Sequence, residues 1–470
     1  MDQVLEEFYK RTKDTLNVKL DIEWSPLADH KEKVKLKMAA GEKVDIVFDA
    51  TWANLNNLSR QGAYIDLTKY FNNDQYPGLK KAFSQQLLDA NKIDGKTFSV
   101  PFIQYFGGAD GIFIRKDLRE NYGLQPIKSE AELETFFKKV KENDPTMVPL
   151  SVEGRRGFYN IFKPQFPASA PTMIVGAGGH WNVVFSTDYK KVMGAVILGD
   201  AADKYAGFPD GFNKPEVFYD FLNKHVAWNK YLEKDAISQK DKVGLFASGK
   251  AAAVENDNSQ FSTINTKLKA GVPGGTLEFY SYNKNIQNLT PGGIATDYLA
   301  SNSVAIPATS GNADRAMMFI DWIFQSQENH DLFEFGIKGV NWEPVGDKEF
   351  KPIGTHNFPG YELTWNPNFI RLSSELDENS KKIYTYLADP STYSVRRMSG
   401  FKFDPTPVKT EIAKIQPKYD EFAQVINNGL VANPLEEAQK RNKEWQSLGL
   451  EKVRAEVIKQ LQAYIDAGGK

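Results

Sequence analysis

Cysteine is absent from this chain of 470 residues, and so are basic tracts and long apolar runs. Without cysteine there are no disulfides, no thiol catalysis and no cysteine-ligated metal site. A membrane-spanning helix needs about 18 or more consecutive apolar residues, and no such run occurs. The net charge of −2 gives no reason to expect a nucleic-acid partner. What remains, with 41% hydrophobic and 25% charged residues, is the composition of an ordinary globular protein.

Motifs for nucleophilic, phosphate or metal chemistry are also missing. There is no GxSxG, no GxxxxGK[ST], and the glycine cluster GAGGHWN lacks the spacing of a dinucleotide fingerprint. The histidines are scattered without metal-ligand spacing: His30, His180, His225, His330 and His356. We therefore assign no catalytic residue, metal or cofactor and expect no enzyme. A glycan-processing enzyme stays the less favoured alternative, because a glycosidase needs only two suitably spaced carboxylates.

The length and the first fifty residues indicate more than one α/β domain. A chain of this size is too long for one hydrophobic core, so we expect two or three domains. Residues Val18–Trp24 alternate like a strand, a lysine-rich helix ends at Gly41, and VDIVFDA is nearly all apolar. Such a run is typical of a parallel strand covered on both faces. This β-α-β order predicts a doubly wound domain.

Helical patterns recur through the rest of the chain. SEAELETFFKKVKEND begins with a capping box, Ser129 with Glu132 three residues later. PEVFYDFLNKHVAWNKYLEK and ADRAMMFIDWIFQS are both expected to be helices. Near the C-terminus an apolar stripe recurs every three or four residues, which predicts an amphipathic helix packed on a domain: Leu450, Val453, Val457, Leu461 and Tyr464.

The stretch LFASGKAAAVEN predicts a helical turn followed by a short buried strand. Its small apolar residues suit no solvated position, so Glu255 and Asn256 lie where the buried strand emerges. In open α/β sheets ligands bind at strand ends. We therefore expect these two side chains to face a ligand.

Five stretches, which together cover nearly the whole chain in order, resemble the family 1 extracellular solute-binding proteins of ABC importers. More narrowly, the chain resembles the lipoprotein-type oligosaccharide-binding subgroup of Gram-positive bacteria. The stretches are KLKMAAGEKVDIVFDATWANLNNLSRQGAYIDLT, DGKTFSVPFIQYFGGADGIFIRKDLRENYGL, LFASGKAAAVEN, NSVAIPATSGNADRAMMFIDWIFQSQENHDLFEFGIKGVNW and SGFKFDPTPVKTEIAKI.

The resemblance implies an α/β, two-lobed periplasmic-binding-protein-like (type II) fold with a multi-strand hinge and a C-terminal helical extension. We expect an N-lobe of residues 1–115 and 293–330, a C-lobe of 116–285 and 331–400, and a helical segment of 401–470 packed on the lobes. Two departures stand out. The family's short strand before the first helix is not seen, and KENDPTMVPL is too short and too poor in carboxylates for a calcium loop.

The resemblance also implies a function. We expect the extracellular binding component of an ABC transporter, a monomer that captures an oligosaccharide in an interlobe cleft by hinge closure. Its partners would be the sugar and the permease subunits in the membrane. We expect the native precursor to be lipid-anchored at the cell surface, with anchor and signal peptide absent from this chain. The family fold does not fix the ligand, so a non-sugar solute such as a peptide stays an alternative, and neutral and anionic sugars stay open.

Sugar binding requires flat apolar faces and polar side chains that engage neighbouring hydroxyls. Trp52 follows the strand VDIVFDA beside Asp49 and Asn54, and Gln104 matches a position at the lip of the family's cleft. The full set of expected ligand contacts is Asp49, Trp52, Asn54, Gln104, Tyr105, Trp181, Glu255, Asn256, Trp342 and Trp365. The tryptophans on helical faces are expected to be structural: Trp228, Trp322 and Trp445.

Overall fold

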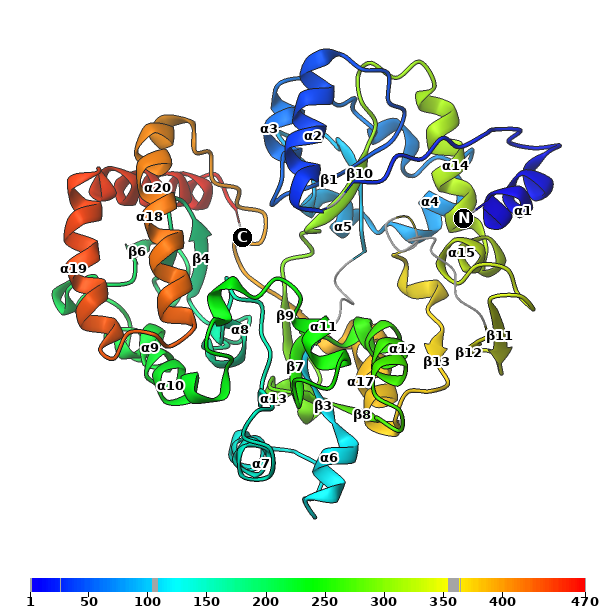
Figure 1. The fold of residues 1–470 in the computed structure, drawn as a ribbon. Coiled ribbons are helices and arrows are strands. Elements are labelled where there is room, and N and C mark those ends of the chain that lie inside the picture. The colour runs from blue at the N-terminus through cyan, green and yellow to red at the C-terminus, as the bar shows by residue number, and fades with distance from the viewer. Residues whose placement is uncertain (1, 26, 104–108, 354–362, 364, 470) are drawn as a thin grey trace. The chain divides into compact units, whose positions relative to one another are not determined.

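The computed structural model describes every residue except 1, 26, 104–108, 354–362, 364 and 470, and it divides into two compact units (Figure 1). Unit 1 comprises residues 1–107, 296–376 and 387–390, and unit 2 comprises 108–295, 377–386 and 391–470. Residues 331–376 thus group with unit 1, whereas the sequence assigns them to the C-lobe. The units are defined by packing alone, so the functional lobe boundaries stay a prediction.

Unit 1 is built on a three-stranded sheet in the order β1-β10-β2, formed by β1 (Val47–Ala50), β10 (Asn302–Ala305) and β2 (Ser99–Pro101). A second sheet contains β11 (Trp342–Val345), β12 (Glu349–Pro352) and β13 (Leu372–Ser373). Its main helices are α1 (Asp2–Thr12), α2 (Leu27–Ala40), α3 (Leu55–Arg60), α4 (Pro77–Ala82), α5 (Gln85–Ala90), α14 (Ala313–Gln325) and α15 (Gln327–Glu334).

Two expectations for the start of the chain are wrong in detail. The strand VDIVFDA becomes β1, but it pairs antiparallel with β10, with Ala50 opposite Asn302. Residues 18–23 alternate between half-buried and exposed and Trp24 is exposed, yet Val18–Trp24 form no strand with any described residue. Period-two alternation reports one-sided burial, which an extended segment can achieve without a sheet partner. The C-cap is confirmed, because Gly41 follows α2 with a positive φ of 68°.

Unit 2 contains two three-stranded antiparallel sheets. The first, in the order β7-β3-β8, consists of β7 (Ala253–Asp257), β3 (Asp110–Arg115) and β8 (Leu277–Ser281). The second, in the order β4-β5-β6, consists of β4 (Thr172–Gly176), β5 (His180–Phe185) and β6 (Val192–Val196). A short pair joins β9 (Ile294–Thr296) to β14 (Tyr393–Val395). The helices are α6 (Lys116–Asn121), α7 (Glu130–Asn143), α8 (Tyr159–Phe162), α9 (Glu216–Tyr219), α10 (Phe221–Trp228), α11 (Lys242–Ala247), α12 (Phe261–Gly271), α13 (Lys284–Gln287), α17 (Glu378–Ala388), α18 (Lys409–Asn427), α19 (Pro434–Ser447) and α20 (Leu450–Asp466).

The C-terminal helices α18, α19 and α20 pack together, and α20 lies against β6 (Figure 1). The predicted stripe on α20 is confirmed, since Leu450, Val453, Val457 and Leu461 are fully buried in one core with the sheet β4-β5-β6. The capping box at α7 is confirmed as well. The backbone N–H of Glu132 donates to Ser129 Oγ at 3.2 Å, and that hydroxyl donates back to Glu132 Oε2 at 3.0 Å.

Other helical predictions need small changes. ADRAMMFIDWIFQS forms α14 as expected, but the helix expected after Pro215 is divided into α9 and α10. Trp228, Trp322 and Trp445 are buried, as predicted. Among the helices that the structure describes, none combines the length and apolar character needed to cross a membrane.

Candidate ligand-binding faces

Unit 1 presents an aromatic row that starts at Trp52 in the turn between β1 and α3. The Trp52 side chain is 48% exposed, and its ring centroid lies 6.5 Å from that of Phe48 on β1. Phe48 lies 6.0 Å from Phe102, which in turn lies 5.9 Å from Trp365. Two tryptophans predicted as ligand contacts therefore belong to one run of neighbouring rings. We call Trp52, Phe48, Phe102 and Trp365 the aromatic row.

Asp49 and Asn54, also predicted as contacts, are brought together but face inward. Asp49 is 1% exposed, and its carboxylate accepts from the N–H groups of Ala50 at 2.7 Å and Asn54 at 3.0 Å and from the Tyr64 hydroxyl at 2.6 Å. Burial raises the pKa of Asp49 above its ordinary value, and these three donors oppose that rise. Asn54 is 7% exposed and donates to the carbonyl of Lys31. Both side chains hold the turn together, which corrects their expected role as ligand contacts.

Two other predicted tryptophans are core residues. Trp342, on β11, is 4% exposed and packs against Phe335 with its Nε1–H bound to the carbonyl of Gly336 at 3.1 Å. Trp181, on β5 of unit 2, is fully buried, and its Nε1–H donates to the carbonyl of Ala177 at 2.7 Å. Neither ring offers a face to a ligand in this conformation, so these two assignments are corrected. Gln104 and Tyr105 lie outside the described residues.

Unit 2 presents a group of charged side chains at one end of the sheet β7-β3-β8. Asp110 at the start of β3 lies directly opposite Asp257 at the end of β7. Glu255 precedes Asp257 by two residues, so it points to the same side of the strand. The charges of Lys163, Arg156 and Lys242 all lower the pKa of Asp110. We call Asp110, Asp257, Glu255, Lys163 and Lys242 the charged face.

The carboxylates of the charged face differ in how they are satisfied. Glu255 is 3% exposed, forms an ion pair with Lys242 at 2.8 Å and accepts a long 3.5 Å hydrogen bond from the Tyr282 hydroxyl. Asp257 caps the following turn by accepting from the N–H of Ser259 at 2.9 Å. Asp110 is an exposed residue, and its carboxylate has no hydrogen-bond or ion-pair partner among the described residues. Asp110 therefore has acceptor capacity that no described residue uses.

Crowding of like charges and burial shift the pKa values on this face. Desolvation raises the pKa of Asp110, and the charge of Glu255 raises it further. Asp257 has a raised pKa from desolvation, with added repulsion from Asp110 and Glu255. Burial lowers the pKa of Lys163, which the charge of Asp110 partly offsets. The Lys163 ammonium donates to Asn160 Oδ1 at 3.0 Å, so no carboxylate is its direct hydrogen-bond partner in the described part of the chain.

Asn256, the last predicted contact, lies on β7 between Glu255 and Asp257 and is half-buried. Its Oδ1 accepts from the N–H of Asp257 at 2.9 Å. Alternation along a strand directs it to the opposite side from its two acidic neighbours. Asn256 thus shares a strand with the charged face without belonging to it.

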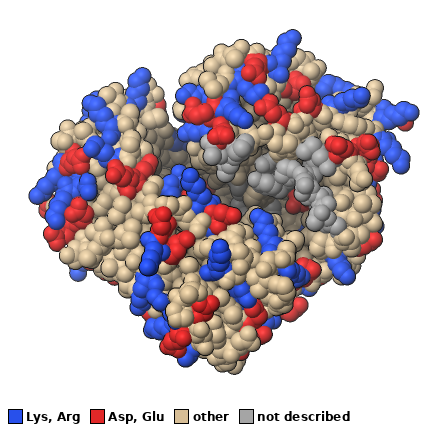
Figure 2. Space-filling model, in the orientation of Figure 1, with Lys and Arg blue, Asp and Glu red and all other residues tan. Residues whose placement is uncertain are grey.

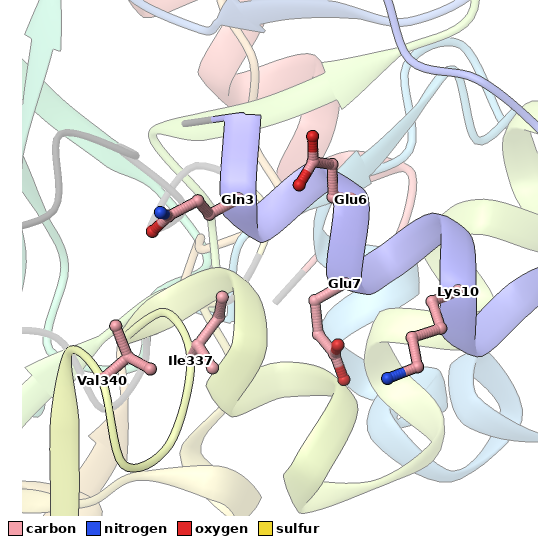
Figure 3. Close-up of a pocket in the computed structure, with 6 residues that line it drawn as sticks. All are labelled: Gln3, Glu6, Glu7, Lys10, Ile337 and Val340. Atoms are coloured by element: carbon pink, nitrogen blue, oxygen red, sulfur yellow. The ribbon is translucent and has the colours of Figure 1, made fainter.

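A separate surface hollow of about 350 Å³ lies on unit 1, between α1 and the turn after α15 (Figure 3). Long polar side chains of α1 and the apolar Ile337 and Val340 line it. None of the residues of the aromatic row or the charged face contributes to it, and it offers no aromatic ring. We therefore do not assign the ligand to this hollow.

The visible surface of each unit favours no single sign of charge (Figure 2). Figure 2 shows Lys and Arg side chains interspersed with Asp and Glu over the visible surface of each unit. Within the described residues, no group of three or more His, Asp or Glu side chains is arranged to hold a metal ion.

Comparison with known proteins identifies the family. Residues 3–340 match the family model described as bacterial extracellular solute-binding protein. The chain belongs to this family. Residues 397–466 of this solute-binding protein match a domain of unknown function, DUF3502, and they include the helices α18 to α20.

Two curated relatives have carbohydrate names. The chain is 23% identical over 450 residues to a carbohydrate ABC transporter substrate-binding protein of Streptococcus pneumoniae, covering 92% of this chain and 81% of the relative. It is 26% identical over 367 residues to a polygalacturonan/rhamnogalacturonan-binding protein of Bacillus subtilis. That match covers 74% of this chain but only 65% of the relative.

Solved structures share the fold over almost the whole chain. The N-glycan transport solute-binding protein of Streptococcus pneumoniae superposes with a TM-score of 0.72 at 20% identity, covering 99% of this chain and 96% of that one. The alginate-binding protein AlgQ2 gives a TM-score of 0.60 at 19% identity, with coverages of 99% and 94%. At such identities the likeness shows the fold alone. The expected α/β, periplasmic-binding-protein-like fold is thereby confirmed.

Several residues of the two faces escaped the sequence analysis. Asp257 could have been found, because the period of a strand places it beside Glu255. Asp110 lies in the quoted stretch GGADGIFIRKD but carries no motif of its own. Lys163 reaches the charged face from a segment with no periodic pattern, so only the tertiary structure reveals it.

Proposed function

We propose that this solute-binding protein captures an oligosaccharide for an ABC importer. The aromatic row is the observation that carries the proposal. The C–H face of a pyranose ring is flat and apolar, so it packs on an exposed indole and buries apolar surface on both partners. Trp52 and the half-buried Trp365 give the row two accessible rings, which suits a ligand with more than one sugar unit, while Phe102, at 5% exposure, packs between them and the core. The carbohydrate names of both curated relatives support the same substrate class.

The charged face supplies the complementary chemistry of the proposal. A carboxylate accepts hydrogen bonds from two neighbouring hydroxyls of a sugar, and these charge-assisted bonds are directional. Asp110, which is exposed and has no hydrogen-bond or ion-pair partner in the described part of the chain, suits that role. We propose that the sugar contacts both faces and favours a closed state, since a ligand shifts a conformational equilibrium by its differential affinity.

The cellular setting is part of the same proposal. As a member of an extracellular family, the protein would be held at the cell surface by a lipid anchor on its precursor and would deliver the sugar to permease subunits in the membrane. A monomer suffices for this role. We assign no catalytic step to either face.

A ligand screen by thermal unfolding tests the proposal. The panel would contain Man1GlcNAc, Man5GlcNAc, raffinose, oligogalacturonates and an unrelated peptide mixture. A ligand present at about 100 times its Kd stabilises the folded state by about 2.7 kcal/mol, so a cognate sugar raises the melting temperature. Stabilisation by peptides and by no sugar would contradict the proposal. Release of reducing ends from the panel would instead show an enzyme.

Small-angle X-ray scattering tests the conformational part. We expect the radius of gyration to fall when the stabilising sugar is added at saturation. An unchanged radius at proven saturation would contradict closure while leaving sugar binding intact.

A further inference from the structure

Trp52 is exposed, yet two separate sets of hydrogen bonds fix it. Its indole Nε1–H donates to Asn302 Oδ1 at 2.8 Å. Asn302 belongs to β10 and lies directly opposite Ala50 of β1, the residue from which the turn departs. The ring is therefore bound to the same sheet that carries its own backbone.

The backbone of the turn is fixed by Asp49. One carboxylate oxygen accepts from the N–H groups of Ala50 and Asn54, which flank Trp52 by two residues on each side. The other oxygen accepts from the Tyr64 hydroxyl at 2.6 Å. A buried carboxylate that accepts three hydrogen bonds closes the turn at both ends.

We infer that Asp49 and Asn302 are positioning residues for Trp52, which hold the indole in one orientation before the sugar arrives. This inference rests on the proposed function, in which the indole of Trp52 is a stacking surface for a sugar ring. Neither residue needs to touch the sugar.

The physical reason is preorganisation. An exposed tryptophan without a partner populates several rotamers, and binding must then select one of them. Immobilising a side chain costs about 0.5–1.5 kcal/mol, which corresponds to between about two- and tenfold in affinity. A ring that is already held avoids this loss. In addition, Phe48 supports the indole from the strand below, with an angle of 52° between the rings.

The first experiment needs no sugar. The protein would be labelled with 5-fluorotryptophan, and Trp52→Phe would assign the Trp52 resonance among the eight tryptophans in the fluorine NMR spectrum. In Asn302→Ala we expect this resonance to shift and to report exchange among rotamers, with the other seven unchanged. Asn302→Asp keeps an acceptor for the indole N–H and should restore the original signal. An unmoved Trp52 resonance in Asn302→Ala would overturn the inference.

The second experiment measures affinity for Man5GlcNAc or, if the wild type does not bind it, for the panel sugar that stabilises the wild type most. We expect Asn302→Ala to weaken binding about three- to tenfold, and Asp49→Asn to weaken it at least as much. Thr51→Ala is the matched control, because it removes a hydroxyl bond to the carbonyl of Ser301 in the same turn without touching the indole. It should stay within about twofold of the wild type.

A double-mutant cycle separates positioning from direct contact. In a Trp52→Ala background, Asn302→Ala should have no further effect on affinity. A loss that persists without the indole would show that Asn302 itself binds the sugar and would contradict the inference. If Asp49→Asn does not fold, Tyr64→Phe removes only one of the three donors and should give a smaller change in the Trp52 resonance. If the wild type binds no sugar, the proposed function is wrong. The NMR experiment would still decide whether Asn302 fixes the orientation of the Trp52 indole.

Discussion

In unit 1 the carboxylate of Asp49 is buried and accepts three hydrogen bonds, whereas in unit 2 Asp110 is an exposed residue whose carboxylate accepts none from the described residues. The same contrast holds for the neighbouring side chains. Around Asp49 the accessible groups are rings, and around Asp110 they are charges. In unit 1 the carboxylate of Asp49 thus fixes the turn that carries the exposed ring of Trp52. In unit 2 the carboxylate of Asp110 can still accept hydrogen bonds.

The contrast indicates a division of labour in recognition. Stacking on aromatic rings tolerates many sugars, because most pyranoses have a flat C–H face. Hydrogen bonds to a carboxylate depend on where the hydroxyls lie, and a mismatch leaves polar groups unpaired at a cost of about 1–3 kcal/mol. We therefore expect unit 1 to contribute affinity and unit 2 to contribute selectivity.

The largest expected effect is on Trp52. Replacing a central aromatic anchor at a binding surface costs about 2 kcal/mol or more, so Trp52→Ala should weaken sugar binding about 30-fold. Because the side chain is half exposed, the melting temperature without sugar should change little. Isothermal titration calorimetry with the cognate sugar measures the loss.

Trp24→Ala is the matched control, since Trp24 is an exposed tryptophan of the same unit, at 41%, outside the aromatic row. Its affinity should equal that of the wild type. Equal losses of sugar affinity in Trp52→Ala and Trp24→Ala would contradict a specific role of the aromatic row in binding.

The second prediction concerns Asp110. Asp110→Asn removes the charge that strengthens the hydrogen bonds from sugar hydroxyls, and we expect about a tenfold loss at pH 7. The raised pKa sets the pH dependence: as pH falls through it, the wild-type carboxylate is protonated and affinity falls. We call this fall of affinity at low pH the acid limb, and we expect it to be absent in Asp110→Asn. Titrations between pH 4 and pH 7 on both proteins test it.

Asp210→Asn, at an exposed position of the same unit, serves as the charge control and should leave both the affinity and its pH profile unchanged. An acid limb that survives in Asp110→Asn would assign the pH dependence to another group. In that case a group other than Asp110 would supply the selective hydrogen bonds that we expect from unit 2.

A smaller effect is expected at Glu255. Its charge is the second cause, after desolvation, of the raised pKa of Asp110. Glu255→Gln removes that repulsion, so the pH at which affinity is half lost should move to a lower value. Affinity at pH 7 should change by about threefold or less. A midpoint that moves to higher pH would contradict the electrostatic coupling of the two carboxylates.

The comparison also shows how far sequence reasoning reaches. Trp52 was predicted as a ligand contact because it directly follows a buried strand, and strand ends are where loops meet ligands. The structure shows its ring to be exposed, and its contact with a ligand stays a prediction. The same argument failed for Asp49, because the turn itself needed an acceptor for its N–H groups, and sequence does not say which acceptor a turn will take. Glu255 lies in the middle of β7, which continues to Asp257, so the strand ends later than expected. Its expected contact with a ligand stays a prediction.

Trp181 and Trp342 show a different limit. Trp181 follows a glycine cluster and Trp342 has polar neighbours, and both were predicted to contact the ligand. In the structure the glycines form the turn of the β4–β5 hairpin, and the residues before Trp342 form the turn that leads from α15 into β11. Both tryptophan side chains are buried. Local polarity therefore describes the turn and says little about the ring it carries.

The smallest effect on affinity is expected at Trp181, the buried counterpart of Trp52. Trp181→Phe should bind sugar within about twofold of the wild type, because the ring is fully buried. We expect the substitution to lower the free energy of unfolding instead. The indole Nε1–H donates to the carbonyl of Ala177, and the Arg454 guanidinium lies 4.9 Å from the ring centroid. Losing the donor leaves a buried carbonyl unpaired, at about 1–3 kcal/mol, and weakens the cation–π contact.

Trp445 supplies the matched comparison for stability. It is fully buried in the same core, but its Nε1–H has no hydrogen-bond partner among the described residues. Trp445→Phe removes a similar volume without breaking such a bond, so urea unfolding should show Trp181→Phe to be less stable by about 1–3 kcal/mol. Equal stabilities would mean that the Ala177 bond contributes nothing. A large loss of sugar affinity in Trp181→Phe, with folding intact, would show that this ring of unit 2 takes part in binding. It would then contradict the contrast between aromatic recognition by unit 1 and polar recognition by unit 2.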